Sequence, residues 1–167
     1  MDHAHRHHTA HSAGPAAEHH GAQRSLNGLA WSATLHCLTG CAIGEVLGMV
    51  IGTALGWGNL ETIALAVVLA FFFGYALTMR PLLRDGMALG AAARLALAAD
   101  TASITVMEIV DNLIMLAIPG AMDAPLDSLL FWGSLALALA IAGIAAFPVN
   151  RWLIARGRGH AVAHAHH

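Results

Sequence analysis

The sequence predicts an all-α fold: a polytopic membrane protein whose four transmembrane helices form a bundle of two helical hairpins. Apolar residues make up 57% of the 167 positions and charged residues only 11%, with a mean hydropathy of +0.65. Soluble domains carry roughly 25% charged residues. The chain also contains four apolar runs, each close to the ~20 residues that a helix needs to cross a bilayer. Composition and run length therefore indicate the same fold.

The four apolar runs define the expected helices, which are Leu29–Trp57, Thr62–Met79, Leu95–Ile118 and Ser128–Val149. The first link is so short that the first two helices must form a hairpin. Pro119-Gly120 with Pro125 marks a similar link between the last two. Arg80-Pro81 is expected to end the second helix, and the link over 80–94 is expected to lie along the membrane interface.

The arginines all fall on one side of this arrangement, and the chain contains no Lys. They are Arg6, Arg24, Arg80, Arg84, Arg94, Arg151, Arg156 and Arg158. The charged residues in the links on the other side are all acidic: Glu61, Asp123 and Asp127. Basic residues mark cytoplasmic loops, so we expect both termini to be cytoplasmic in a bacterial inner membrane. Because the arginines form no basic patch, a nucleic-acid partner is not expected.

Both ends of the chain are rich in histidine, with seven between His3 and His20 and four between His160 and His167. Short His-rich tracts bind Zn, Ni or Cu ions. The alternation with Ala, Arg and Gly is unlike an expression tag and favours a natural metal-binding tail, although a tail that only solubilises is an alternative. The expected division is a cytoplasmic tail over 1–28, a four-helix membrane domain over 29–153 and a second cytoplasmic tail over 154–167.

Glycine repeats every fourth residue along the first helix, forming a ridge without side chains. The ridge consists of Gly40, Gly44, Gly48, Gly52 and Gly56. Such a ridge lets another helix approach closely, either within one chain or between subunits. Because one chain need not fill the whole ridge, we expect a homo-oligomer that associates through this helix.

A second stripe lies one residue along from the ridge and holds Cys37, Cys41 and Glu45. With His36 it offers thiolate, imidazole and carboxylate groups, which suit several transition-metal ions. The alternative is that both Cys are small buried hydrophobic residues. A redox dithiol is less attractive, because three residues separate the two Cys instead of two and they lie toward a reducing cytoplasm.

The third helix has a polar face within an arc of about 140°. It carries Asp100, Met107, Glu108, Asp111, Asn112 and Met115. A carboxylate at the centre of a membrane helix costs about 2.5 to 3.5 kcal/mol, and no basic residue lies within an apolar run to neutralise it. The first and third helices run in the same direction, so Glu45 and Glu108 should lie at similar depth and the two polar stripes can meet.

These polar groups also have a structural interpretation, in which they hydrogen-bond to hydroxyls on neighbouring helices. The available partners are Thr34, Thr39, Ser103 and Thr105. Intramembrane ionisable groups nevertheless usually mark a path for ions or protons. Met49, Met107 and Met115 offer soft thioether ligands, but a methionine at helical spacing is more often core filling.

Three segments resemble a known family. They are His36-Cys37 through Gly40-Cys41 to Gly44-Glu45, Ala99-Asp100-Thr101 through Ser103 to Met107-Glu108, and Pro148-Val149-Asn150-Arg151-Trp152. Together they resemble the bacterial membrane family catalogued as domain of unknown function 4396, and the resemblance extends from Leu35 to Gly159. The family has no activity to transfer, so the resemblance supports the fold and leaves function to the chemistry of the residues.

The sequence thus predicts a protein that binds a transition-metal ion such as Cu, Zn or Ni. It would move the ion across the membrane along a path that lies between the first and third helices. The expected metal ligands are His36, Cys37, Cys41, Glu45, Asp100, Glu108, Asp111 and Asn112. The other expected partners are membrane lipid and further copies of the chain. The alternatives are a proton or alkali-cation channel that uses only the carboxylates, and a metal-binding membrane adaptor that transports nothing. No enzyme motif is present, so catalysis is not expected.

Overall fold

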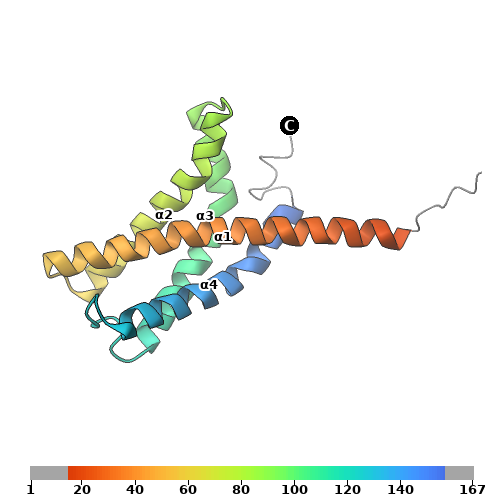
Figure 1. Ribbon diagram of the computed structural model, residues 1–167. Coiled ribbons are helices and arrows are strands. Elements are labelled where there is room, and N and C mark those ends of the chain that lie inside the picture. Colours follow the sequence, from red (N-terminus) through yellow and green to blue (C-terminus); the bar gives the residue numbers. More distant parts are fainter. Residues whose placement is uncertain (1–14, 157–167) are drawn as a thin grey trace, which may run out of the picture.

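The computed structural model describes the backbone of residues 15–156 and the side chains of residues 26–156. Within this part the chain forms four α-helices and no strand (Figure 1), namely α1 Pro15–Leu55, α2 Asn59–Arg84, α3 Leu89–Ala117 and α4 Leu129–Ala155. The all-α prediction is confirmed. Most of the N-terminal His-rich segment and all of the C-terminal one lie outside the described residues.

Three of the described helices are long and apolar enough to cross a membrane, over Leu26–Leu55, Asn59–Arg84 and Leu129–Ala155. They indicate a membrane protein. The remaining helix, α3, is 29 residues long, but Asp100, Glu108 and Asp111 lower its hydropathy. The prediction of helices long and apolar enough to span a membrane is therefore confirmed for these three segments.

The prediction that Arg80-Pro81 ends the second helix is wrong, because α2 continues through Pro81 to Arg84. Proline lacks only its own N–H, and its carbonyl still accepts from the backbone N–H of Asp85 at 3.0 Å. The link to α3 is consequently a short turn over 85–88, not an interfacial segment over 80–94. In the same way, Pro148 lies inside α4.

Two helices end in the same glycine turn. Gly56 has φ +66° and Gly86 has φ +83°, a left-handed conformation that glycine adopts without strain. After α1, the N–H of Trp57 donates to the Gly52 carbonyl at 2.9 Å, and the N–H of Met87 makes the equivalent bond after α2 at 3.0 Å. These are Schellman caps. Gly56 therefore ends α1, and its expected role in the packing ridge is wrong.

Two side-chain hydrogen bonds show which ends of the helices lie together. The α1–α2 turn meets the α3–α4 loop, since the Asn59 side-chain amide donates to Asp123 at 3.0 Å. At the opposite end of α1, the side chains of Asn27 and Arg151 are joined at 2.8 Å. The chain thus runs up and down, and at that opposite end the α2–α3 hairpin splays away from α1 and α4 (Figure 1).

The outer surface carries the side chains expected of a lipid-facing protein. A tryptophan lies near each end of two apolar spans, with exposed fractions of 45–51%. They are Trp31 and Trp57 for the span Leu26–Leu55 of α1, and Trp132 and Trp152 for α4. The pair on α4 is separated by about 30 Å at 1.5 Å per residue. This spacing matches the hydrocarbon thickness of a bilayer, where tryptophan concentrates at the two interfaces.

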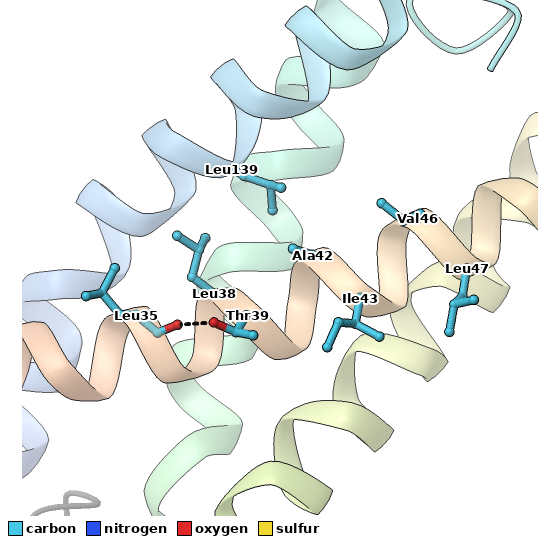
Figure 2. Close-up of a pocket in the computed structure, with 8 residues that line it drawn as sticks. All are labelled: Leu35, Leu38, Thr39, Ala42, Ile43, Val46, Leu47 and Leu139. Atoms are coloured by element: carbon cyan, nitrogen blue, oxygen red, sulfur yellow. Dashed lines mark hydrogen bonds between the residues drawn. The ribbon is translucent and has the colours of Figure 1, made fainter. Parts of the chain in front are cut away.

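A groove of about 810 Å³ opens on the outer side of α1, where α4 contributes one wall (Figure 2). It is lined by Leu35, Leu38, Thr39, Ala42, Ile43, Val46, Leu47 and Leu139. The single polar side chain, Thr39, donates its hydroxyl hydrogen to the Leu35 carbonyl at 2.8 Å. The groove is therefore apolar and belongs to the lipid-facing surface.

The glycine ridge packs against α2 of the same chain. A methyl group on Gly40 would lie 2.7 Å from Cα of Gly74, and one on Gly48 would lie 2.5 Å from Cα of Ala66. Gly44 likewise faces Ala70, and Gly52 faces Thr62. The two backbones approach this closely only because neither helix has large side chains along the contact. The homo-oligomer was expected because one chain need not fill the whole ridge. Within the chain, α2 fills the ridge from Gly40 to Gly52, so that reason for expecting an oligomer no longer applies.

Candidate functional site

A row of buried polar and sulfur-containing side chains runs between α1 and α3, with one hydroxyl from α2. We refer to it as the polar seam. It consists of Cys37, Cys41, Glu45, Thr78, Asp100, Ser103, Met107, Glu108, Asp111 and Asn112. All of these residues are buried except Asn112, which is half-buried. The two polar stripes expected from the sequence therefore do meet.

Helical spacing explains how the seam forms. Cys37, Cys41 and Glu45 repeat every fourth residue on α1, immediately beside the glycine ridge. Because the ridge holds α1 against α2, the neighbouring stripe faces α3. On α3 the charged and sulfur-containing residues share one buried face, and the exposed positions include Leu97, Leu113 and Leu116. Local periodicity thus gives the stripes, and the close α1–α2 contact sets their direction.

At the end of the seam nearer the α2–α3 turn, Cys37 contacts Asp100. The thiol donates to Oδ1 of the carboxylate across 3.8 Å. The Thr78 hydroxyl of α2 is a further neighbour of Asp100, and Ser103 is a neighbour of the Cys37 thiol. This part of the seam therefore combines one thiol, one carboxyl group and two hydroxyls from three helices.

The middle of the seam pairs two sulfur atoms beside a carboxyl group. The Cys41 thiol donates to the Met107 thioether, with 3.9 Å between Sγ and Sδ. The side chain of Glu108 adjoins the Cys41 thiol and also the Glu45 carboxyl group. Two carboxyl groups side by side in an apolar interior cannot both stay ionised unless a cation lies with them. The pair must therefore hold a proton or a cation.

The remaining part of the seam contains Glu45, Asp111 and Asn112. The Asn112 amide lies 3.5 Å from Oε1 of Glu45 and donates to the backbone carbonyl of Glu108 at 2.9 Å. Asp111 is a charge neighbour of Glu45. Four carboxyl groups thus follow one another through the seam, from Asp100 to Asp111.

The electrostatic balance of the seam is one-sided. Arg24 and Arg80 bracket the α1 stripe in the sequence, and Arg94 and Arg151 bracket that of α3, so no Arg or Lys occurs within either. In the described part of the chain, both carboxylate oxygens of Glu108 and both of Asp111 are buried without a hydrogen-bond partner. Buried native polar groups are nearly always paired. Such unpaired oxygens are stable in an apolar interior only when protonated or beside a cation.

The predicted metal ligands are brought together only in part. Cys37, Cys41, Glu45, Asp100, Glu108, Asp111 and Asn112 all belong to the seam. His36 is half-buried, unlike the two Cys beside it. Within residues 26–156, no three His, Cys, Asp or Glu side chains form a group able to hold a metal ion by themselves. The ligands are thus spread along a path and are not gathered at one centre, so metal binding stays a prediction.

In the alternative interpretation, the carboxylates only hydrogen-bond to hydroxyls on neighbouring helices. The four hydroxyls expected to do so give this interpretation little support. Thr39 and Thr105 donate to backbone carbonyls of their own helices, at 2.8 and 2.7 Å. Thr34 donates to Ala30 and accepts from the Asn150 amide at 2.9 Å. Three of the four candidate partners therefore make these hydrogen bonds away from the acids, and Ser103 is the fourth.

Sequence reasoning missed Thr78 and treated Met107 as core filler. A signal for Thr78 was present, because α2 carries small residues at every fourth position. The series is Thr62, Ala66, Ala70, Gly74 and Thr78. It matches the glycine ridge of α1, so a close α1–α2 contact would have placed Thr78 near the start of the Cys stripe. No sequence signal distinguishes Met107 from an ordinary core methionine.

A recess of about 290 Å³ between α2 and α3 reaches the seam from the side. Its lining is Ile63, Val67, Phe71, Thr105, Glu108, Ile109 and Asn112. The recess is mainly apolar and shares Glu108 and Asn112 with the seam. The middle of the seam is consequently separated from the outer surface of the α2–α3 hairpin by little more than these two side chains.

Comparison with known proteins gives a family without a known activity. No curated protein and no solved structure matches the chain. The family described as Domain of unknown function (DUF4396) matches residues 28–159, a range that contains the whole polar seam. The resemblance noted in the sequence is therefore confirmed, and the chain belongs to the DUF4396 family.

Proposed function

We propose that the protein transfers a transition-metal cation across its membrane along the polar seam and that α3 is the fourth membrane span. The observation that carries this proposal is the row of four buried carboxyl groups, interleaved with two thiols and containing no Arg or Lys. Ionisable groups inside a membrane bundle usually mark a path for ions. The carboxyl groups supply the negative charge that a cation needs in an apolar interior.

The surface of α3 supports its assignment as a span. The charged side chains Asp100, Glu108 and Asp111 are only 2–4% exposed, whereas Ile109 and Leu113 are 55% and 61% exposed. The helix thus presents large apolar groups outward and keeps its charges in the seam. At 1.5 Å per residue its 29 residues extend about 43 Å, which exceeds the ~30 Å hydrocarbon thickness of a bilayer.

Metal ligands must lose their protons when a metal ion binds. A cation that enters the seam would therefore displace protons from the Cys thiols and from the Glu45–Glu108 pair. This links movement of the metal ion in one direction to release of protons. The His-rich tails, in this proposal cytoplasmic, would deliver or sequester the ion.

The second candidate is proton conduction, and one observation favours it. Glu45 and Glu108 are adjacent carboxyl groups, which suits proton transfer between them even if no metal ion enters. The two candidates differ in the role of the thiols. Proton currents would be insensitive to Cys37→Ser and Cys41→Ser, whereas metal transport would not.

The test uses the full chain in liposomes loaded with a metal-sensitive dye and a pH-sensitive dye. We expect uptake of a transition metal accompanied by proton movement, with at least a tenfold loss of uptake in Glu108→Gln. This change keeps the shape of the side chain and removes its charge. Glu61→Gln is the matched control, because Glu61 is exposed in the first turn of α2. Wild-type rates for metals and protons in the double variant Glu45→Gln with Glu108→Gln would refute both candidates.

A further inference from the structure

The contact between Cys41 and Met107 is the feature of the seam that the acids alone do not explain. The two sulfurs lie 3.9 Å apart, and the residues are 1% and 0% exposed. The adjoining Glu108 is 4% exposed, and both of its carboxylate oxygens are buried without a hydrogen-bond partner. Three donor groups from two helices therefore converge: a thiol, a thioether and a carboxyl group.

The sulfur separation restricts the geometry of a bound metal ion. With metal–sulfur bonds of about 2.3 Å, two sulfurs at this separation subtend an angle of about 116° at the metal. A linear two-coordinate site would need the sulfurs about 4.6 Å apart on the same bond length. The observed 3.9 Å thus fits a bent arrangement with room for at least one further ligand, and not a linear one. The unpaired carboxylate of Glu108 is placed to supply the third ligand.

The chemistry of the donors selects the class of ion. Thiolate and thioether sulfur are soft ligands that select Cu(I) among the biological first-row metals. Zn²⁺ instead prefers four tetrahedral ligands drawn from Cys, His, Asp and Glu. Within residues 26–156, no group of three or more such ligands is present. A monovalent ion also needs only one negative ligand for neutrality, so Glu108 can keep a proton.

We infer that Cys41, Met107 and Glu108 form a binding site for a soft monovalent metal cation of the Cu(I) and Ag(I) class. The inference rests on the proposed function, because it names the cargo of the same seam. On binding, the Cys41 S–H bond breaks and a sulfur–metal bond forms. The proton passes to the Glu45 carboxylate, which adjoins Glu108, or to water. No electron is transferred, so no oxidant or reductant is required.

The experiment titrates the full chain in detergent with Ag(I) in a chloride-free buffer, because Ag(I) shares the softness and charge of Cu(I) and needs no reductant. Affinity is measured by competition with a silver chelator, and the thiolate–silver bond by its ultraviolet absorption. Met107→Leu should weaken Ag(I) binding at least tenfold. Met115→Leu is the matched control: Met115 is also buried on α3, but it packs in an apolar cluster with Met49. Both variants keep the His-rich tails, so the tails contribute equally.

Cys41→Ser should remove most of the thiolate–silver absorption, whereas Cys37→Ser should retain it. The inference is overturned if Met107→Leu binds Ag(I) as tightly as Met115→Leu, or if Cys41→Ser keeps the absorption. Both Met variants conserve volume, and circular dichroism checks that they fold. The outcome is separable from that of the proposed function. Ag(I) binding with the expected pattern but no uptake by liposomes retains the site and rejects transport, whereas uptake with no effect of Met107→Leu on binding rejects the site alone.

Discussion

Replacing Gly40 by Ala tests whether the glycine ridge is the internal contact that orients the polar seam. The new methyl group would lie 2.7 Å from Cα and 2.8 Å from N of Gly74, where ordinary contacts begin at 3.4 Å. The opposing atoms are backbone and cannot rotate away. The helices α1 and α2 must therefore separate by about 0.7 Å or more at this point, and overpacking of this kind typically costs 1–3 kcal/mol.

Gly28→Ala is the matched control within the same helix, since a methyl group there would meet nothing within 4 Å. Alanine favours a helix over glycine by about 1 kcal/mol at either position, so the difference between the two variants isolates the packing penalty. The measurement is the free energy of unfolding in mixed detergent micelles. Gly40→Ala should be the less stable of the two by about 1–3 kcal/mol. Equal stability would refute internal packing, and a loss of mass on native mass spectrometry in Gly40→Ala alone would assign the ridge to a subunit interface.

Two further predictions concern topology and a buried hydrogen bond between α1 and α4. A reporter that is active only in the cytoplasm should be active when fused after His167 and silent when inserted at Asp123. The reason is that the arginines lie on the side of the termini. The reverse pattern would place the termini outside. Asn150→Ala should destabilise the protein by about 0.6–1.7 kcal/mol, because it removes the buried 2.9 Å bond to Thr34. Asn59→Ala, which removes an exposed 3.0 Å bond, should change the free energy of unfolding less, and an equal change in both variants would contradict this reasoning.

The fold was largely predictable, because apolar run length reports directly on membrane-spanning helices. The errors came from local rules that tertiary structure overrides. Pro81 was expected to stop α2, yet a proline near a helix end removes one donor and leaves the carbonyls free to accept. Gly56 fitted the fourfold repeat of the ridge, but its positive φ makes it a helix cap. Spacing alone does not distinguish a packing glycine from a capping one.

The site was predictable as two stripes and not as a set of contacts. The spacing of Cys37, Cys41 and Glu45 required one face of a helix, and the acids of α3 required another. Which side chain opposes which depends on the rotation and the depth of each helix. The sequence offered three methionines as soft ligands but favoured core filling for all of them, and only the 3.9 Å distance from Cys41 singles out Met107.

The ridge and the seam lie on adjacent faces of α1, and this arrangement connects packing to function. Two ridge glycines precede a seam residue by one position, namely Gly40 before Cys41 and Gly44 before Glu45. Close contact with α2 therefore fixes the rotation of α1, and that rotation directs the thiols and Glu45 toward α3. Metal sites require their ligands within a few tenths of an ångström of the favoured geometry. A shift of about 0.7 Å at Gly40 is large on this scale. Gly40→Ala should consequently weaken Ag(I) binding even in the fraction that remains folded, although it alters no ligand, whereas Gly28→Ala should leave binding unchanged.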